Sequence, residues 1–251
     1  MTTAGMVSAA QPQSALRVRI FVDFWNFSLS LRRQNNTFMV NWRPVGPLFA
    51  AEAGKLVAPG GSVVFEALHV YGSFDPAKPQ DAKLKNWFTN TLDRMPGTHV
   101  VLVERQQKMG YPKCPHCQAE VTNCPSCGGD MRGTEEKGVD TRIVADMISL
   151  AWANAYDVAV LVSSDRDFVP VAEFLQTKGI KVVHAAFPPK GSNLSQKCWA
   201  NFNVISLMPQ IERQQPQKSG GSRRPDAVRL SSGDAPAASR RQVSQSPPSA
   251  P

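Results

Sequence analysis

Acidic residues recur in this sequence where an apolar stretch gives way to a turn. Asp165 and Asp167 follow VLVSS, Asp23 follows VRIFV, and Asp140 lies in EKGVD at the start of a stretch with helical spacing. Carboxylates gathered in one pocket repel one another unless a cation lies between them. Mg²⁺ and Mn²⁺ prefer oxygen ligands and bind through a few carboxylates, water and substrate phosphates. Together these residues predict a hard-cation site that activates water for attack on a phosphodiester.

Each acidic residue also has a structural interpretation. Asp167 precedes a helical stretch, where capping the N-terminus is the commonest role of Asp, and Asp140 could favour its own helix N-terminus. Asp23 is harder to explain in this way because it sets a charge against a buried strand. The set of acidic residues is therefore more informative than any one of them.

Apolar stretches and stretches with helical spacing alternate along the chain. Strands are expected at 18–23, 63–71, 98–104, 157–164 and 180–187, with a short sixth at 203–207. Helices are expected at 84–95, 138–154 and 168–178. Continuously apolar strands separated by helices predict an α/β fold with a parallel sheet covered on both faces. Ligands bind such sheets beyond the carboxyl ends of the strands, so the acidic residues are expected to meet at one rim.

Three blocks of the sequence resemble the NYN domain of the PIN-like nuclease superfamily, in particular its LabA-like branch. They are VRIFVDFWNF, EKGVDTRIVADMISLA and YDVAVLVSSDRDFVPVAEFLQTKGIKV. They carry D-x-x-N after the first strand, K-G-x-D at a helix start and S-x-D-x-D-F after the fourth strand. The resemblance covers about residues 17–207. It implies a Rossmann-like PIN fold, with a mostly parallel central sheet and helices on both faces, and metal-dependent cleavage of RNA.

The resemblance also implies roles for individual residues. The catalytic residues, which would hold Mg²⁺ or Mn²⁺, are Asp23, Asp140, Asp165 and Asp167. Asn26 would hydrogen-bond a ligand, a metal-bound water or the aspartates. Lys137 would meet a phosphate, with a solvated lysine as the alternative. Ser163 and Ser164 would donate to the carboxylates, with plain turn residues as the alternative.

Arg166 departs from the family pattern, in which the residue between the two aspartates is often small. It would either steer phosphate toward the site or lie across the acidic rim. Phe24, Trp25 and Phe27 surround Asn26 in DFWNF. Aromatic residues directly after a buried strand usually belong to the core, and base stacking on Trp25 is the alternative.

Four cysteines form two closely spaced pairs. They are Cys114, Cys117, Cys124 and Cys127, in the pattern C-x2-C, six residues, C-x2-C. Pro follows the first cysteine of each pair, which suits a tight turn whose backbone amides point at the sulfurs. Two such turns complete a tetrahedral site and predict a structural Zn²⁺ knuckle in an insertion over 111–132, with iron or a redox dithiol as alternatives. The knuckle would either help to hold RNA over the rim or staple a long loop.

The overall charge favours a polyanionic partner. Lys and Arg outnumber Asp and Glu by 28 to 20, for a net charge of +8. Residues 1–16 and 212–251 are expected to be disordered ends of a domain over 17–211. The second end is a basic tail that could attract nucleic acid or bind a protein. No apolar run approaches the roughly 18 residues of a membrane span, and the clustered cysteines favour a reducing, cytoplasmic location.

These observations predict a metal-dependent endoribonuclease with RNA as its partner. The first alternative is a catalytically inactive NYN module that binds RNA or protein. The second is a phosphatase or receiver-type α/β protein, which also gathers acidic residues at strand ends. It is disfavoured because haloacid-dehalogenase phosphatases need D-x-D after the first strand, whereas this chain has Asp23-Phe24-Trp25-Asn26.

Overall fold

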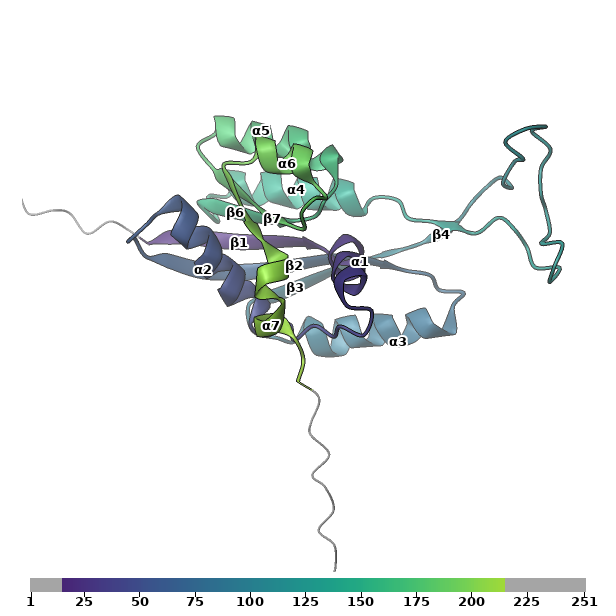
Figure 1. Ribbon diagram of the computed structural model, residues 1–251, viewed down its shortest axis with the longest axis horizontal. Coiled ribbons are helices and arrows are strands. Elements are labelled where there is room, and N and C mark those ends of the chain that lie inside the picture. The colour runs from purple at the N-terminus through teal and green to yellow at the C-terminus, as the bar shows by residue number, and fades with distance from the viewer. Residues whose placement is uncertain (1–14, 215–251) are drawn as a thin grey trace, which may run out of the picture. The chain divides into compact units, whose positions relative to one another are not determined.

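A six-stranded parallel sheet forms the centre of the protein in the computed structural model, which describes residues 15–214 (Figure 1). The strand order is β3-β2-β1-β6-β7-β8. The strands are β1 (Leu16–Asp23), β2 (Val63–Phe74), β3 (Thr98–Glu104), β6 (Val158–Val162), β7 (Lys181–Ala186) and β8 (Ala200–Asn203). Every neighbouring pair is parallel, so the α/β sheet predicted from the sequence is confirmed.

Helices cover both faces of this sheet. They are α1 (Phe24–Gln34), α2 (Val45–Val57), α3 (Pro79–Trp87), α4 (Val139–Trp152), α5 (Val169–Thr177), α6 (Ser192–Lys197) and α7 (Met208–Ile211). A π-helical turn, Phe88–Leu92, continues α3, and 3-10 turns cover Arg166–Phe168 and Val204–Leu207. The architecture is that of a PIN-like, Rossmann-like fold.

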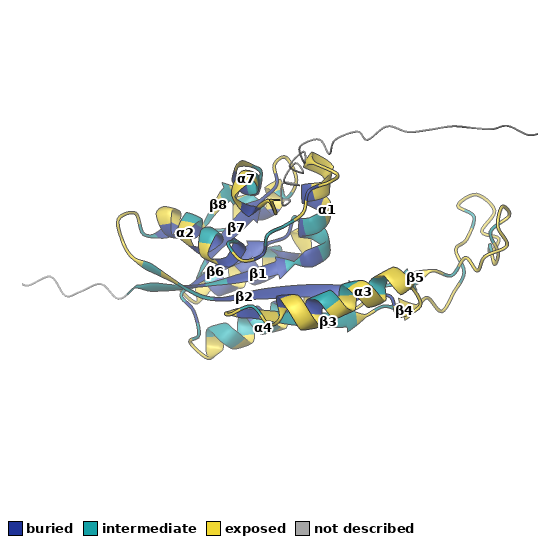
Figure 2. Cartoon of the chain, turned by 90° about the horizontal axis from the view of Figure 1, so that it is seen from below, coloured by how far each residue is buried: buried dark blue, intermediate teal, exposed yellow. Residues whose placement is uncertain are grey.

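Side chains that alternate along the strands build two separate cores. In β1, Ile20 and Val22 pack on the side of α1 and α2 with Phe49, whereas Phe21 packs on the other side with Ile143 of α4. This alternation is the period of two that a strand buried on both faces requires. Figure 2 shows the resulting buried sheet and the exposed outer faces of the helices.

The strand order reverses between β1 and β6. The chain builds β2 and β3 on one side of β1 and then returns to build β6, β7 and β8 on the other. Val22 pairs with Val162, so β1 and β6 end at the same level. A crevice beyond the carboxyl ends of two such strands is the usual ligand site of an open α/β sheet.

Several element bounds differ from those expected. The sixth strand lies at Ala200–Asn203, and residues 204–207 instead form a 3-10 turn because the Asn203 side chain accepts the N–H of Ile205 and caps that turn. The helix expected at 84–95 begins earlier, at Pro79, since proline is well suited to the first turn of a helix. Helices α1 and α2 were not expected from the sequence.

The expectations for the two chain ends lie almost entirely outside the described residues. Within them, Leu16 already begins β1, and the N–H of Arg213 donates to the Met39 carbonyl. The folded part therefore extends slightly beyond the 17–211 expected from the sequence. None of the helices between residues 15 and 214 has the length and apolar character needed to cross a membrane.

Candidate active site

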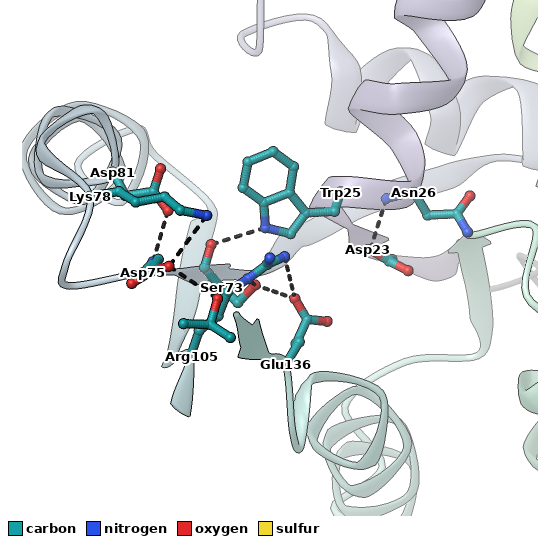
Figure 3. A network of polar contacts seen from close by, with 10 residues as sticks. Asp23, Trp25, Asn26, Ser73, Asp75, Lys78, Asp81, Arg105 and Glu136 are labelled. Atoms are coloured by element: carbon teal, nitrogen blue, oxygen red, sulfur yellow. Dashed lines mark hydrogen bonds and ion pairs between the residues drawn. The ribbon is translucent and has the colours of Figure 1, made fainter. Parts of the chain in front are cut away.

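Asp23 ends β1 and caps α1. Its Oδ1 accepts the backbone N–H of Asn26 at 3.1 Å (Figure 3), which fixes the carboxylate at the helix start. Its Oδ2 accepts a hydrogen bond from the hydroxyl of Ser163, the residue that follows β6, at 3.3 Å. The carboxylate is therefore held from both strands that flank the point where the strand order reverses.

Two further hydrogen bonds join the turns that follow β1 and β6. The Asn26 Oδ1 accepts the backbone N–H of Ser164 at 3.0 Å, and the Ser163 hydroxyl accepts the N–H of Asp165 at 3.2 Å. Ser163 thus makes the contact with a carboxylate that was expected. Ser164 does not make the expected bond to a carboxylate. Its hydroxyl is buried and has no hydrogen-bond partner among the described residues.

Asp165 caps the 3-10 turn that leads into α5. Its Oδ1 accepts the N–H of Asp167 at 3.0 Å. The capping role that the sequence assigned to Asp167 therefore belongs to Asp165, because the 3-10 turn begins one residue after it. The Asp167 side chain is exposed at the same rim.

Asp140 reaches the rim from the first turn of α4. Gly138, with φ of +95°, turns the chain into this helix in a conformation that few other residues adopt. The surrounding protein, followed by the charges of Asp165, Glu136 and Asp167, raises the pKa of Asp140. Asp140 is thus close enough to these carboxylates to be affected by their charge.

The pKa of Asp23 is raised to about 6. Burial is the largest cause, and the charges of Asp140 and Glu136 add to it, outweighing the hydrogen bonds from Asn26 and Ser163. The structure therefore brings the predicted residues Asp23, Asp140, Asp165 and Asp167 together beyond the carboxyl ends of β1 and β6. We call this group the acidic rim. Among residues 15–214, none of Asp23, Asp140, Asp165 and Asp167 takes part in an ion pair.

The donor set fits a hard divalent cation by charge and by atom type. In the described part of the chain, however, no three His, Cys, Asp or Glu side chains form a group that could hold a metal ion. Mg²⁺ in proteins is usually bound through one or two carboxylates together with water and substrate phosphates.

Comparison with known proteins identifies the family. The chain matches the NYN domain over residues 17–206. It belongs to the NYN domain family. Among solved structures it is similar to a protein of unknown function from Vibrio parahaemolyticus RIMD 2210633, with 17% identity over 78% of this chain and 96% of that one and a TM-score of 0.46. A search of the curated proteins found no match. The resemblance stated from the three sequence blocks is confirmed, and it places the chain among the PIN-like, nuclease-like proteins.

Glu136 of the NYN domain is an acidic rim residue that sequence reasoning missed. Its Oε2 accepts the hydroxyl of Ser73 and the guanidinium of Arg105, the latter at 3.3 Å (Figure 3). Its charge nevertheless raises the pKa of both Asp23 and Asp140. The available signal was its place in EKGVD, four residues before Asp140.

The surroundings of Lys137 and Trp25 agree with the structural interpretations that the sequence offered beside the functional ones. The Lys137 Nζ lies 2.6 Å from Glu135 Oε1, and its side chain is exposed, as for a solvated lysine. The half-buried Trp25 packs on the core, its Nε1 donates to the Ser73 carbonyl at 2.9 Å, and Arg105 covers its ring at 5.6 Å.

The cysteine pairs lie in an insertion between β3 and α4. A short antiparallel ribbon of β4 (Gln106–Gln107) and β5 (Thr134–Glu135) carries it. Each pair forms the expected tight turn: backbone amides of Cys117 and His116 bond to Cys114 and lower the pKa of its thiol, and Cys124 is placed in the same way. The four cysteines do not come together as one metal-holding group in the described residues.

Proposed function

We propose that this NYN domain is a metal-dependent endoribonuclease that hydrolyses RNA phosphodiesters. The observation that supports the proposal most strongly is the meeting of carboxylates from β1, α4 and the turn after β6 at the point where the strand order reverses. Their mutual repulsion has no cationic partner within residues 15–214, which is the condition that a bound cation would relieve.

The metal would be held by Asp23, Asp140, Asp165 and Asp167, and it would supply Lewis-acid polarisation and a more acidic water. The chain's own contribution is to hold the carboxylates. Ser163 fixes the orientation of Asp23, and Asn26 ties the turn after β1 to the turn after β6. Above about pH 6 the Asp23 carboxylate is ionised and available as a ligand. Asn26 and Ser164 line the hollow beside the carboxylates, and with the exposed Lys137 they are the residues proposed to meet the substrate.

The same proposal includes a structural Zn²⁺ bound by Cys114, Cys117, Cys124 and Cys127, RNA as the partner, and a cytoplasmic location. The fit to zinc comes from the turns. Backbone amides directed at Cys114 and Cys124 favour the thiolate form, which is the form that binds Zn²⁺.

An RNA cleavage assay tests the proposal. Purified protein would be incubated with Mn²⁺ and end-labelled single-stranded or hairpin RNA, alongside the variants Asp23→Asn and Asp165→Asn. We expect each variant to lose activity by about 100-fold or more, because it removes a ligand oxygen and a charge. Glu173→Gln is the matched control, since Glu173 is an exposed carboxylate on α5 that pairs with Lys197 outside the rim.

The outcomes separate the two candidate functions. Wild-type cleavage that needs Mn²⁺ and is lost only in the rim variants supports hydrolysis. Equal cleavage by wild type and both rim variants contradicts this metal site. A wild-type protein that binds RNA without cleaving it would be the catalytically inactive binding module instead.

A further inference from the structure

A cleft adjoins the acidic rim on the side of α1. Its volume is about 490 Å³, and it lies between α1, the turn after β6 and the turn that joins β7 to α6. Asn26, Ser164 and Asp165 line it and are also part of the acidic rim. A chain bound at the rim would therefore extend directly into this cleft.

One face of α1 forms a wall of the cleft. Asn26, Ser30 and Arg33 lie four and three residues apart, so they share a side of the helix. Asn26 contacts the rim, and Arg33, in the last turn, lies farther along the same wall. The helix thus places a cation at a fixed offset from the carboxylates.

Three basic side chains from separate segments line this one cleft. They are Arg33 of α1, Arg166 in the turn after β6 and Lys190 in the turn before α6. All three are exposed, and within residues 15–214 their side chains make no ion pair or hydrogen bond. Single exposed cations are ordinary, but three that line one cleft beside an acidic site offer unused donors to an anion.

The wall that carries Lys190 is held tightly against the rim. The N–H of Lys190 donates to the Phe187 carbonyl at 2.9 Å, which closes the turn. The next residue, Gly191, has φ of +72°, and a Cβ there would lie 3.1 Å from Ser164 Cα and 2.9 Å from His184 Cε1. The buried His184 ring contacts the Ser163 carbonyl and the Ser195 hydroxyl at 2.7 Å each, so β6, β7 and α6 are joined beneath the cleft.

We propose that this cleft binds a backbone phosphate of the RNA strand, next to the bond that is cleaved, through Arg33, Arg166 and Lys190. The inference rests on the proposed function and adds the surface that holds the substrate. The acidic rim alone repels a polyanion, so attraction must come from neighbouring cations. Guanidinium groups match phosphate oxygens in a two-pronged geometry, and Lys adds a compact charge.

RNA affinity measured without cleavage tests the cleft. Fluorescence anisotropy with a labelled single-stranded RNA of about twelve nucleotides would be recorded in an Asp23→Asn background. This substitution prevents cleavage during the measurement and leaves the cleft unchanged, because Asp23 does not line it. Into it we would introduce Arg33→Gln, Arg166→Gln or Lys190→Gln. The matched control is Arg32→Gln, which removes the same charge from the same turn of α1 but lines a different hollow with Phe38 and Met39.

Each cleft variant is expected to weaken binding about fivefold at 0.1 M salt. This value follows from losing one phosphate contact, which makes the negative slope of log K against log salt shallower by about 0.7 for a single strand. The Arg32→Gln protein should keep both the affinity and the slope of its parent. All these positions are exposed, so their melting temperatures should match that of the parent.

The alternatives give distinct results. If the cleft variants bind RNA as tightly as Arg32→Gln while the otherwise wild-type protein cleaves RNA with Mn²⁺, the cleft proposal is wrong and the proposed function stands. If the cleft variants lose affinity but the wild type cleaves nothing, phosphate binding is supported and hydrolysis is contradicted. Absence of any RNA binding by the wild type contradicts both proposals.

Discussion

Asp23 has two opposing effects on stability. As the cap of α1 it satisfies the N–H of Asn26, which favours folding. As a carboxylate surrounded by protein and by the charges of Asp140 and Glu136, it disfavours folding once it ionises. The energy lost to repulsion at such a site is recovered when a cation binds, which links the metal affinity of the rim to its instability without metal.

Replacing Asp23 with Asn should separate these two effects. Asn also caps helices well, so the variant removes the charge and keeps the cap. Folding raises the pKa of Asp23 from about 4 to about 6. The protonated side chain therefore favours the folded state at low pH, and this contribution to the free energy of unfolding is lost as pH rises from 4 through 6. In metal-free protein we expect Asp23→Asn to raise the free energy of unfolding at pH 7.5 by on the order of 1 to 3 kcal/mol.

Urea unfolding of wild type and variant at pH 4 and pH 7.5 checks this expectation. The difference between the two proteins should nearly vanish at pH 4, where the native Asp23 is protonated. Using the difference removes the contributions of other titrating groups, such as the buried His184. A difference of equal size at both pH values would mean that the effect of Asp23 on stability is not electrostatic.

At the residue scale, the motifs predicted most of the rim. Asp23, Asp140 and Asp165 stand next to recognisable strands or helix starts, and strand ends of a parallel sheet must meet at one edge. For Glu136 the local signal is only its place in EKGVD, because the contacts that orient its side chain come from Ser73 and Arg105, which lie far away in the sequence. Contacts of that kind leave no local pattern.

At the scale of elements, the turn between β7 and α6 determines the shape of the cleft. It brings Lys190 to the rim only because Gly191 allows the backbones of two turns to come close together. A side chain at this position would meet His184, whose ring contacts the Ser163 carbonyl, and Ser164, whose N–H donates to Asn26 of α1. Close approach of this kind is a recognised reason for glycine.

The variant Gly191→Ala should therefore lower both stability and RNA affinity. Gly179→Ala is the control, because Gly179 also has a positive φ, of +84°, but nothing lies within 4 Å of a Cβ there. Backbone strain alone should cost both variants about 1 kcal/mol, and Gly191→Ala should lose more because of its contacts. Thermal unfolding and RNA anisotropy provide the measurements. Equal losses of stability with unchanged RNA affinity in both variants would show that the turn does not support the cleft.

Element positions were predictable where the pattern was long and apolar. The strands at 18–23 and 98–104 agree closely with β1 and β3. Helix α1 was missed because its aromatic start, DFWNF, continues the apolar character of β1, and the change to helix is made by the Asp23 cap. The short edge strand β8 was displaced for a similar reason, since the Asn203 side chain stops it.

At the scale of the whole domain, the insertion between β3 and α4 is separate from the packing of the core. No residue from 105 to 138 is buried, and both hydrophobic cores are built entirely from other segments. The sequence predicted the cysteine turns because their spacing is local. The sequence also predicted that the two turns meet in one tetrahedral site, but the four cysteines form no metal-holding group among the described residues, and no core contact positions one turn against the other.

Removing the insertion should leave the fold intact. The ribbon can be closed directly, since Gln107 pairs with Thr134 and the N–H of Lys108 donates to the Gly133 carbonyl at 3.2 Å. Replacing residues 109–132 with Asn-Gly supplies the two-residue turn that suits such a ribbon. We expect the free energy of unfolding to change by less than about 0.5 kcal/mol, because no core contact is lost, and zinc bound by the chain to fall to zero.

The same deletion distinguishes the two roles of the knuckle. Urea unfolding, metal analysis and RNA anisotropy would be compared with those of a full-length Cys114→Ser, Cys124→Ser variant. If the insertion holds RNA over the rim, the deletion weakens RNA binding while the fold is kept. If it only staples a long loop, the deletion binds RNA normally, and the cysteine variant becomes sensitive to protease within 109–132. Loss of cooperative unfolding on deletion would contradict the separation of insertion and core, because an independent ribbon cannot stabilise packing in which it takes no part.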